Sequence, residues 1–405
     1  MILDKNCLVF CSRNKYENQI TLKFAKENFD ASNYFVVSDY PIGDFYIDLE
    51  KYDISDLTST DWELINKLID IKDVVFKDRL LRNIDLLEAK ELILKVAKNA
   101  IELFSTKKFS YLIVHPVDNY VMDVFIRIAK FYQCEVSGVS AFFVQGYKRI
   151  TVYGEHNSSR IVDNEEVIQL KEILTTKFKS YMVSSKYKAL YQSLLYYFKY
   201  KIKYLLFYVI KHKLLKNKGY DYACTPYSAT VDKINKLFPF KYFTNTIDSV
   251  AEKSIYIPMH YHPEATIEYW SDSTENVDYI TSLVEAVRYF SDNGWEVYLK
   301  EHPAMCFRQN VDLYKKLKKI KRVFILNPFL ETSNIMNEFD NFLIWTGSTG
   351  IEALVNNKTV YFVSSNYYYN KKTDQKYEKV CFAKEEEKNE FLKRILENTI
   401  KWGEI

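Results

Sequence analysis

Residues 344–354 have the sequence IWTGSTGIEAL, in which an apolar run, a small hydroxyl-rich turn and a helical pattern follow one another. Phe342–Thr346 predicts a buried strand and Ile351–Asn356 predicts a helix, so the turn joins a strand to a helix. The chain has only nine glycines in 405 residues, and two of them, Gly347 and Gly350, bracket this turn. We therefore expect the backbone to bend sharply here or to approach a ligand closely.

Strands and helices alternate around this stretch in the last third of the chain. Further strands are expected at Ser254–Pro258, Glu296–Lys300, Val323–Leu326 and Thr359–Val363, helices at Asp278–Ser291 and Val311–Ile320, and a closing helix at Lys384–Trp402. Such alternation is typical of a parallel sheet with helices on both faces.

The first third of the chain shows the same alternation. Strands are expected at Cys7–Cys11, Tyr34–Ser38, Tyr111–His115, Ala141–Val144 and Arg149–Tyr153, and helices at Leu87–Phe104 and Val121–Tyr132. The predicted fold class is therefore α/β, with two doubly wound, Rossmann-like domains that face a cleft. In such sheets ligands bind beyond the carboxyl ends of the strands.

The segment between these domains is rich in lysine. From Ile173 to Tyr220 there are eleven lysines and no Asp, Glu or Arg, and since the whole chain carries +3, the remainder carries −8. Its apolar residues follow a helical spacing at Leu195, Phe198, Ile202, Leu205, Leu206 and Val209. Two interpretations stay open: a linker helix packed between the domains with its lysines in water, or an interfacial helix on an anionic membrane surface.

The composition narrows the class of protein. Six cysteines are scattered without a CxxC pair, which favours a reduced, cytoplasmic protein over a disulfide framework or a zinc site. The sequence from Met1 lacks the pattern of a signal peptide, and no uncharged run reaches the roughly 20 residues of a membrane span. One basic segment on an otherwise acidic chain predicts an anionic surface as partner and no nucleic acid. We expect four parts: residues 1–165, a basic helical connector 166–220, residues 221–385 and a closing helix 386–405.

Four of the six histidines, His115, His260, His262 and His302, fall at the ends of predicted strands. A single histidine at such a place is usually structural, but this concentration indicates a polar site. His302 ends an earlier strand of the same predicted sheet as the glycine turn, where it is able to donate to a phosphate oxygen. The alternative for His302-Pro303 is a polar strand end before a turn fixed by proline.

The glycine turn itself has the chemistry of a phosphate site. Backbone N–H groups and the positive end of a helix dipole converge there, and Ser348 and Thr349 add hydroxyl donors. Glu352 is placed to bind ribose hydroxyls, as acidic residues do in other nucleotide sites. The alternative is a capping box, because Thr349 and Glu352 have the Thr-x-x-Glu spacing.

Three segments together resemble a known family. They are YIPMHYHPEAT at 256–266, LKEHP at 299–303 and TGSTGIEAL at 346–354. These look like the conserved blocks of bacterial capsule and surface polysaccharide biosynthesis glycosyltransferases, relatives of the Kdo transferases that use CMP-activated sugars. The His-Pro and Ser/Thr-Gly elements also occur in bacterial sialyltransferases and in teichoic acid polymerases that use CDP-glycerol. The resemblance implies a GT-B fold and a cytidine nucleotide donor more firmly than a particular sugar.

The resemblance implies roles for individual residues. The C-terminal domain, 221–385, would hold the nucleotide sugar and the N-terminal domain, 1–165, the acceptor. The donor-binding residues would be His302, Pro303, Thr346, Gly347, Ser348, Thr349, Gly350 and Glu352. No Asp-x-Asp motif occurs, so we expect neither a metal nor any cofactor besides the CMP-sugar substrate.

The match is looser in the N-terminal domain. The segment FFVQGYKR at 142–149 resembles a short strand and turn in which an acidic residue commonly precedes the glycine, but Gln145 stands there. Because glutamine is no nucleophile, the candidates for a catalytic carboxylate are Asp118 and Glu264. Asp118 has the alternative of capping the following helix, and Glu264 that of binding the acceptor or orienting a histidine. Contacts to acceptor or donor sugar are expected from His115, Gln145, Arg149, His260 and His262.

The expected activity is transfer of Kdo or another nonulosonic sugar from CMP to a hydroxyl of a surface polysaccharide or a lipid-linked glycan. The Lys-rich helix 186–218 would hold the enzyme at the inner face of the cytoplasmic membrane. Two alternatives stay open. One is a GT-B transferase using CDP-glycerol or a UDP-sugar, and the other is a non-catalytic scaffold in a polysaccharide synthesis complex, which Gln145 favours.

Overall fold

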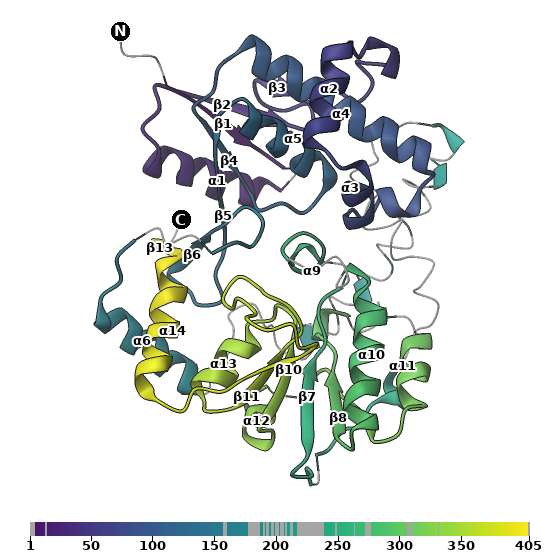
Figure 1. Ribbon diagram of the computed structural model, residues 1–405, viewed down its shortest axis with the longest axis vertical. Coiled ribbons are helices and arrows are strands. Elements are labelled where there is room, and N and C mark those ends of the chain that lie inside the picture. Colours follow the sequence, from purple (N-terminus) through teal and green to yellow (C-terminus); the bar gives the residue numbers. More distant parts are fainter. Residues whose placement is uncertain are drawn as a thin grey trace. The chain divides into compact units, whose positions relative to one another are not determined.

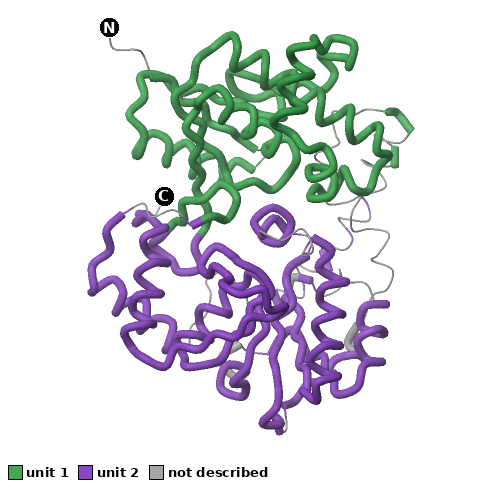
Figure 2. The backbone as a smooth tube through the Cα atoms, in the orientation of Figure 1, with its two compact units in different colours: residues 1–141, 148–155, 203–229 green, residues 142–147, 156–202, 230–405 purple. Residues whose placement is uncertain are grey.

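The structure is a computed structural model that forms two compact units (Figure 2). Unit 1 comprises residues 1–141, 148–155 and 203–229, and unit 2 comprises residues 142–147, 156–202 and 230–405. The described residues are 5–12, 14–156, 160–176, 187, 188, 191, 194, 195, 198, 202, 206, 209, 210, 214–216, 239–247, 249–262, 264–271, 277–305, 309, 311–330 and 332–403. Most of the predicted Lys-rich helix 186–218 lies outside them. Within the described part, no helix has the length and apolar character that crossing a membrane requires.

The first sheet is mainly parallel and has seven strands in the order β13-β6-β5-β4-β1-β2-β3 (Figure 1). Its strands are β1 (Asn6–Phe10), β2 (Asn33–Ser38), β3 (Phe45–Tyr46), β4 (Tyr111–Val114), β5 (Glu135–Ala141), β6 (Tyr147–Ile150) and β13 (Thr399–Lys401). Strands β1 to β5 pair in parallel, whereas β6 runs antiparallel to β5.

The helices of unit 1 connect these parallel strands. They are α1 (Lys15–Asn28), α2 (Ser59–Leu68), α3 (Ile71–Lys77), α4 (Leu86–Thr106) and α5 (Tyr120–Phe131), with short 3-10 helices η1 (Ile54–Asp56) and η2 (Leu81–Asn83). Helix α4 begins where the Asp85 side chain accepts the N–H groups of Leu87 and Glu88, a regular N-cap. Helix α5 is tied to α3 by Arg127, which donates to both Asp123 and Asp73.

The second sheet has six strands in the order β12-β11-β10-β7-β8-β9. They are β7 (Ser254–Pro258), β8 (Glu296–Lys300), β9 (Val323–Leu326), β10 (Asn341–Ile344), β11 (Thr359–Phe362) and β12 (Glu378–Val380). All pairs are parallel except β11 with β12. The helices of unit 2 are α6 (Asn164–Thr175), α9 (Ala265–Glu268), α10 (Tyr279–Asp292), α11 (Val311–Lys318), α12 (Thr332–Glu338), α13 (Thr349–Val355) and α14 (Glu385–Glu397), with η6 (Pro239–Tyr242) and η8 (Pro303–Met305).

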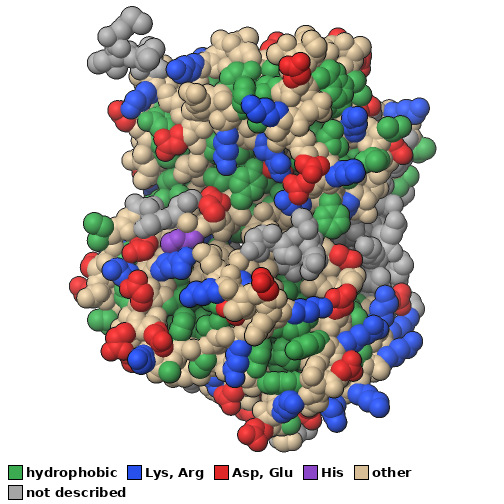
Figure 3. Space-filling model, in the orientation of Figure 1, with side chains coloured by type: hydrophobic (Ala, Val, Ile, Leu, Met, Phe, Trp, Pro, Cys, Tyr) green, Lys and Arg blue, Asp and Glu red, His purple; other side chains and the backbone are tan. Residues whose placement is uncertain are grey.

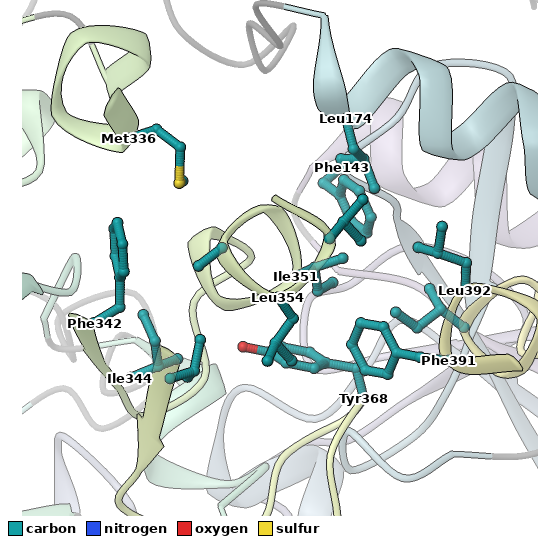
Figure 4. Packing of buried hydrophobic residues seen from close by; sticks show 14 of the residues in the cluster. Phe143, Leu174, Met336, Phe342, Ile344, Ile351, Leu354, Tyr368, Phe391 and Leu392 are labelled. Atoms are coloured by element: carbon teal, nitrogen blue, oxygen red, sulfur yellow. The ribbon is translucent and has the colours of Figure 1, made fainter. Parts of the chain in front are cut away.

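Both faces of this sheet are covered by apolar side chains. Ile255 and Ile257 of β7 belong to a cluster with Leu283 of α10 and Leu317 of α11. Tyr256, between them in sequence, belongs to a second cluster with residues of α6, α12, α13 and α14, part of which Figure 4 shows. Because alternate residues of a strand point to opposite faces, the helices cover the sheet on both sides.

These two sheets confirm the predicted α/β class with two doubly wound units. Two element predictions are wrong. Residues Ala141–Val144 are not a strand, because β5 ends at Ala141 and Phe142, Phe143 and Val144 pack into the second cluster of unit 2. The predicted closing helix at Lys384–Trp402 ends at Glu397 and is followed by β13. The strand predicted at Arg149–Tyr153 is β6, which begins two residues earlier, at Tyr147.

Candidate functional site

The segments 256–266, 299–303 and 346–354 meet at the carboxyl ends of three neighbouring strands in unit 2. Strand β7 lies between β10 and β8. Pro258 at the end of β7 pairs with Lys300 at the end of β8, so His260 and His302 follow at one level, two residues further on. Thr346 likewise stands two residues beyond the end of β10. This edge of a parallel sheet is where α/β proteins bind ligands.

His260 connects the ends of β7 and β10. Its Nε2 atom accepts the backbone N–H of Thr346 at 3.4 Å, and a Cβ on Gly347 would lie 3.7 Å from its Cε1 atom. Its own backbone N–H donates to the hydroxyl of Tyr279 at 2.9 Å. Burial, with a contribution from His302, lowers the pKa of His260 to about 4. His260 is therefore neutral at pH 7 and serves as an acceptor.

Aromatic rings surround the histidines. Tyr279, which is fully buried, lies 5.6 Å from His260, 5.3 Å from His262 and 5.4 Å from Trp345 between ring centroids. Tyr261 meets the ring of His302 edge to face at 5.8 Å. His302 is exposed, and Pro303 after it begins η8. Of these two histidines at one level, His302 is thus open to solvent and His260 is tied to the backbone.

Side chains of the loop that follows β11 form hydrogen bonds to the backbone of the glycine turn. Asn366 donates its amide N–H to the carbonyl of Trp345 at 2.9 Å, and the Tyr368 hydroxyl donates to the carbonyl of Gly347 at 2.8 Å. Both side chains are buried. Together with His260 on Thr346, they fix three consecutive residues of the turn by hydrogen bonds to the backbone.

Helix α13 follows the turn, and it does not begin with the capping box that was the alternative interpretation of Thr349 and Glu352. Ser348 is the N-cap residue and makes no side-chain capping bond, while Thr349 is already the first helical residue. The Thr349-x-x-Glu352 spacing therefore falls one position out of the capping-box register. Burial raises the pKa of Glu352 to about 7, and burial, with a smaller contribution from Glu352, raises the pKa of Tyr256 on β7.

Two buried side-chain oxygen atoms at this edge have no hydrogen-bond partner among the described residues. They are Oε2 of Glu301 and Oγ1 of Thr346, whose side chains are 1% and 4% exposed. The other carboxyl oxygen of Glu301 accepts the Tyr314 hydroxyl at 2.7 Å. Burial raises the pKa of Glu301 to about 8 and lowers that of Lys300 to about 8. Unsatisfied buried polar groups are rare in folded proteins and gather at functional sites.

Glu264 lies at the start of the one-turn helix α9. Its backbone carbonyl accepts the N–H groups of Ile267 and Glu268, and its carboxylate accepts the Thr266 hydroxyl at 2.9 Å. The side chain is half-buried. These contacts place Glu264 as the N-cap residue of α9, and its catalytic role stays a prediction.

The other candidates lie around β4 and β6. His115 follows β4 directly, and Asp118 is half-buried in the loop before α5. Asn119, and not Asp118, caps α5, since its side chain accepts the N–H of Met122 and also donates to the Asp118 carboxylate. Gln145 is exposed beside Gly146, which has a φ of 86°, and Arg149 is buried in β6.

The sequence predicted the histidines and the glycine turn but missed the residues that support them, Tyr279, Glu301, Asn366 and Tyr368. Glu301 lies inside the segment LKEHP at 299–303, so the sequence could have predicted it as a site residue. Tyr279, Asn366 and Tyr368 carry no local signal, because their partners are 19 to 21 residues away in the chain.

No family model matches the sequence, and no curated protein matches it significantly. Among solved structures, the chain is similar to KpsC of Thermosulfurimonas dismutans, a β-Kdo 2,4-transferase, with 12% identity over 73% of this chain and 85% of that one and a TM-score of 0.33. It is also similar to the UDP-GlcNAc 2-epimerase of Neisseria meningitidis, with 13% identity over 90% and 84% and a TM-score of 0.28. A glycosyltransferase of Rickettsia africae matches with 10% identity over 88% and 79% and a TM-score of 0.24. Each similarity is too low to assign an activity to this chain.

Proposed function

We propose that the protein is a glycosyltransferase whose nucleotide-sugar donor binds at the carboxyl edge of the unit 2 sheet. The observation that supports this most is the bond from Thr346 N–H to His260, with His302 at the same level on the next strand. Three segments far apart in sequence, each resembling a block of the CMP-sugar transferases, thereby meet at one sheet edge. The donor is a CMP-activated nonulosonic sugar, Kdo or a relative, and the acceptor is a hydroxyl of a surface polysaccharide or a lipid-linked glycan.

In the donor complex, the exposed His302 and the hydroxyls of Ser348 and Thr349 contact the phosphate of CMP, and Glu352 binds the ribose. Thr346, Gly347 and Gly350 shape the turn, and Pro303 fixes the chain after His302. Burial leaves Glu301 protonated at neutral pH, so its carboxyl does not repel the phosphate next to His302.

The transfer needs one base and a stabilised leaving group. Asp118 or Glu264 accepts the proton of the acceptor hydroxyl, whose oxygen then bonds to the anomeric carbon of the donor sugar. The bond from that carbon to the phosphate oxygen breaks, and CMP leaves with the electron pair. Hydrogen-bond donors that already point to the site where negative charge develops on CMP lower the barrier without a metal ion. His115, Gln145, Arg149, His260 and His262 remain candidates for contacts to the two sugars.

Calorimetric titration with CMP tests the proposal. We expect wild-type protein to bind CMP and the His302→Ala variant to bind it at least tenfold more weakly, because a charge-assisted hydrogen bond to phosphate contributes about 1.5–3 kcal/mol. His156→Ala is the matched control, since His156 bonds to the carbonyl of Arg394 in α14 and lies outside the cluster. Equal CMP affinity of His302→Ala and wild type would contradict the donor site.

An alternative is that the same site binds another class of nucleotide donor. The Ser/Thr-Gly and His-Pro segments also resemble transferases that use CDP-glycerol, and a UDP-sugar fits the same phosphate contacts. Thermal unfolding with CMP, CDP, UMP and UDP separates these donors, because a ligand that binds only the folded protein raises its stability. The largest rise with CMP supports the CMP-sugar, whereas a larger rise with CDP or UDP assigns the other donor.

Gln145 favours a second function, that of a non-catalytic scaffold in a polysaccharide synthesis complex. Incubation of purified protein with a CMP-sugar and an acceptor glycan distinguishes the two, with released CMP and extended glycan as the readouts. We expect turnover that falls at least a hundredfold in Asp118→Asn or in Glu264→Gln, the range of general base catalysis. Nucleotide binding without turnover under all conditions would favour the scaffold.

We propose further that the Lys-rich segment 186–218 holds the protein on the inner face of the cytoplasmic membrane. Most described apolar side chains in this segment are exposed, among them Tyr191 at 63%, Phe198 at 51% and Ile202 at 58%. A linker helix packed between domains would bury such side chains, whereas an interfacial helix offers them to lipid. Eleven lysines without an acidic residue from Ile173 to Tyr220 complement an anionic surface.

Sedimentation with vesicles tests the membrane proposal. We expect binding to vesicles with 30% phosphatidylglycerol, little binding to pure phosphatidylcholine, and loss of binding in the triple variant Lys199→Glu, Lys201→Glu, Lys203→Glu. The control changes Lys316, Lys318 and Lys319, all exposed at the end of α11 or just after it, to Glu. Equal loss in both triple variants would show a general charge effect and contradict the proposal.

A further inference from the structure

Tyr368 reaches the glycine turn from the loop after β11. Its ring packs in the second apolar cluster of unit 2, at 5.9 Å from Phe362 and 6.1 Å from Phe391 between ring centroids. Figure 4 shows its hydroxyl oxygen directed away from Phe391 and toward the strand that carries Ile344. This hydroxyl donates to the carbonyl of Gly347 at 2.8 Å. The ring anchors the side chain, and the hydroxyl alone contacts the turn.

Gly350 leaves the space that the Tyr368 hydroxyl occupies. A Cβ at this position would lie 2.3 Å from the hydroxyl oxygen and 3.3 Å from two carbons of Ile344. Cβ atoms essentially never come that close to another atom, so any other residue at 350 would displace the Tyr368 hydroxyl or the turn. The two residues are thus complementary, and this explains the second glycine of the turn without reference to a ligand.

The loop that carries Tyr368 is itself fixed. The Asn366 side-chain oxygen accepts the N–H groups of Tyr368 and Tyr369 at 3.1 and 3.0 Å, and its amide donates to Trp345. The loop and the turn therefore hold each other by two bonds, one from Asn366 and one from Tyr368. A turn with glycine at two positions loses much conformational entropy when it is ordered, and these bonds order it before any ligand arrives.

We propose that Tyr368 is a positioning residue, whose hydroxyl holds the Gly347–Gly350 turn in the conformation that binds the donor phosphate. The proposal rests on the proposed function for the identity of the ligand. Tyr368 does not touch the nucleotide. It acts through the backbone of Gly347, next to the hydroxyl of Ser348.

Tyr368→Phe tests this role, because it removes the hydroxyl and keeps the packed ring. We expect CMP to bind about three- to tenfold more weakly, the effect of losing one hydrogen bond that orders the site. We also expect faster hydrogen exchange in a peptide covering 345–352. The matched control is Tyr377→Phe, which removes a buried hydroxyl that has no hydrogen-bond partner among the described residues. Wild-type CMP affinity and unchanged exchange in Tyr368→Phe would overturn the proposal.

A double-mutant cycle tests the same contact without any nucleotide. Gly350→Ala should lower the melting temperature strongly in wild type and much less in the Tyr368→Phe background, where the nearest clashing atom is gone. Additive effects would overturn the proposal. If the wild type binds no cytidine nucleotide, the proposed function fails, while hydrogen exchange and the cycle still decide whether Tyr368 orders the turn.

Discussion

Two ionisable side chains at the carboxyl edge of the unit 2 sheet, Glu301 and His260, are uncharged because they are buried. Glu301 and His260 are both neutral at pH 7, one because its pKa is raised to about 8 and the other because its pKa is lowered to about 4. Each also has a defined hydrogen bond, to Tyr314 and to Thr346. At this edge the exposed His302 is therefore the histidine placed to meet an anion.

The burial of Glu301 predicts a stability that depends on pH. Its pKa is about 8 in the folded protein against 4.5 ordinarily, so the folded state holds the proton longer and stability falls as pH rises from about 4.5 to 8. Glu301→Gln should remove this contribution, which is on the order of a few kcal/mol. Urea unfolding of both proteins at pH 5 and pH 8.5 measures it. Parallel pH profiles of wild type and variant would contradict the assignment.

The bond between His260 and Thr346 predicts a difference between two conservative variants. Glutamine places its oxygen near the position of Nε2, whereas asparagine places it near Nδ1, so His260→Gln should retain more CMP affinity and stability than His260→Asn. With a folded pKa of about 4 against 6.5, wild type should lose stability as pH falls through this range, and neither variant should share that loss. Equal behaviour of the two variants in calorimetry and thermal unfolding would count against the bond.

In strand β5, a close contact with a neighbouring backbone segment limits the size of the side chain at one position. Gly138 of β5 has no room for a side chain, because a Cβ would lie 2.3 Å from the carbonyl oxygen of Thr151. Gly138→Ala should therefore destabilise the protein by about 2–3 kcal/mol or more through overpacking. Gly403→Ala is the control, since no atom of the described residues lies within 4 Å of its Cβ position. A thermal unfolding midpoint of Gly138→Ala close to that of the control would refute this reason for the glycine.

Elements with an uninterrupted apolar run were predictable from the sequence. A very short strand, and an apolar run of the N-terminal part that packs in unit 2, were not. Strands β7 and β8 were predicted with their bounds, because their apolar runs are uninterrupted and both faces of the sheet are buried. The run Phe142–Val144 looked like a strand for the same reason, yet helices of unit 2 bury it. Strand β13 carries only three residues, too few for a periodic signal.

For the candidate site, the sequence predicted the residues that follow strand ends and missed the side chains that form hydrogen bonds to them. His260, His302 and Thr346 follow predicted strands, so topology alone places them at one level. The contact between Tyr368 and Gly350 depends on a loop conformation that residue types do not encode locally, since one of the Asn366 bonds that fix the loop goes to Trp345, directly after β10.

At the scale of the whole molecule, charge is divided between one basic segment and a mildly acidic remainder. On the face shown in Figure 3, Lys and Arg side chains stand among Asp and Glu side chains over both units. Such mixing creates no extended field of one sign, so the body offers no second surface for polyanions there. The Lys-rich segment is therefore the surface that we propose for an anionic membrane, and its vesicle binding is tested separately from the proposed donor site in unit 2.

The assignment of the donor site to unit 2 predicts where a bound nucleotide slows hydrogen exchange. On addition of CMP, protection should appear in peptides covering 258–262, 300–305, 345–352 and 364–369, which come from strand ends and the loop of unit 2. Peptides of α1 and α4 in unit 1 serve as the internal control. Protection that appears in unit 1 and spares these four segments would contradict the assignment.

The structure of the protein with CMP bound, from a crystal soaked with the nucleotide, tests the central claim most directly. We predict the phosphate within hydrogen-bond distance of His302 and of Ser348 or Thr349, with the ribose beside Glu352. A nucleotide bound elsewhere, with His302 and the Gly347–Gly350 turn free of it, would contradict the account.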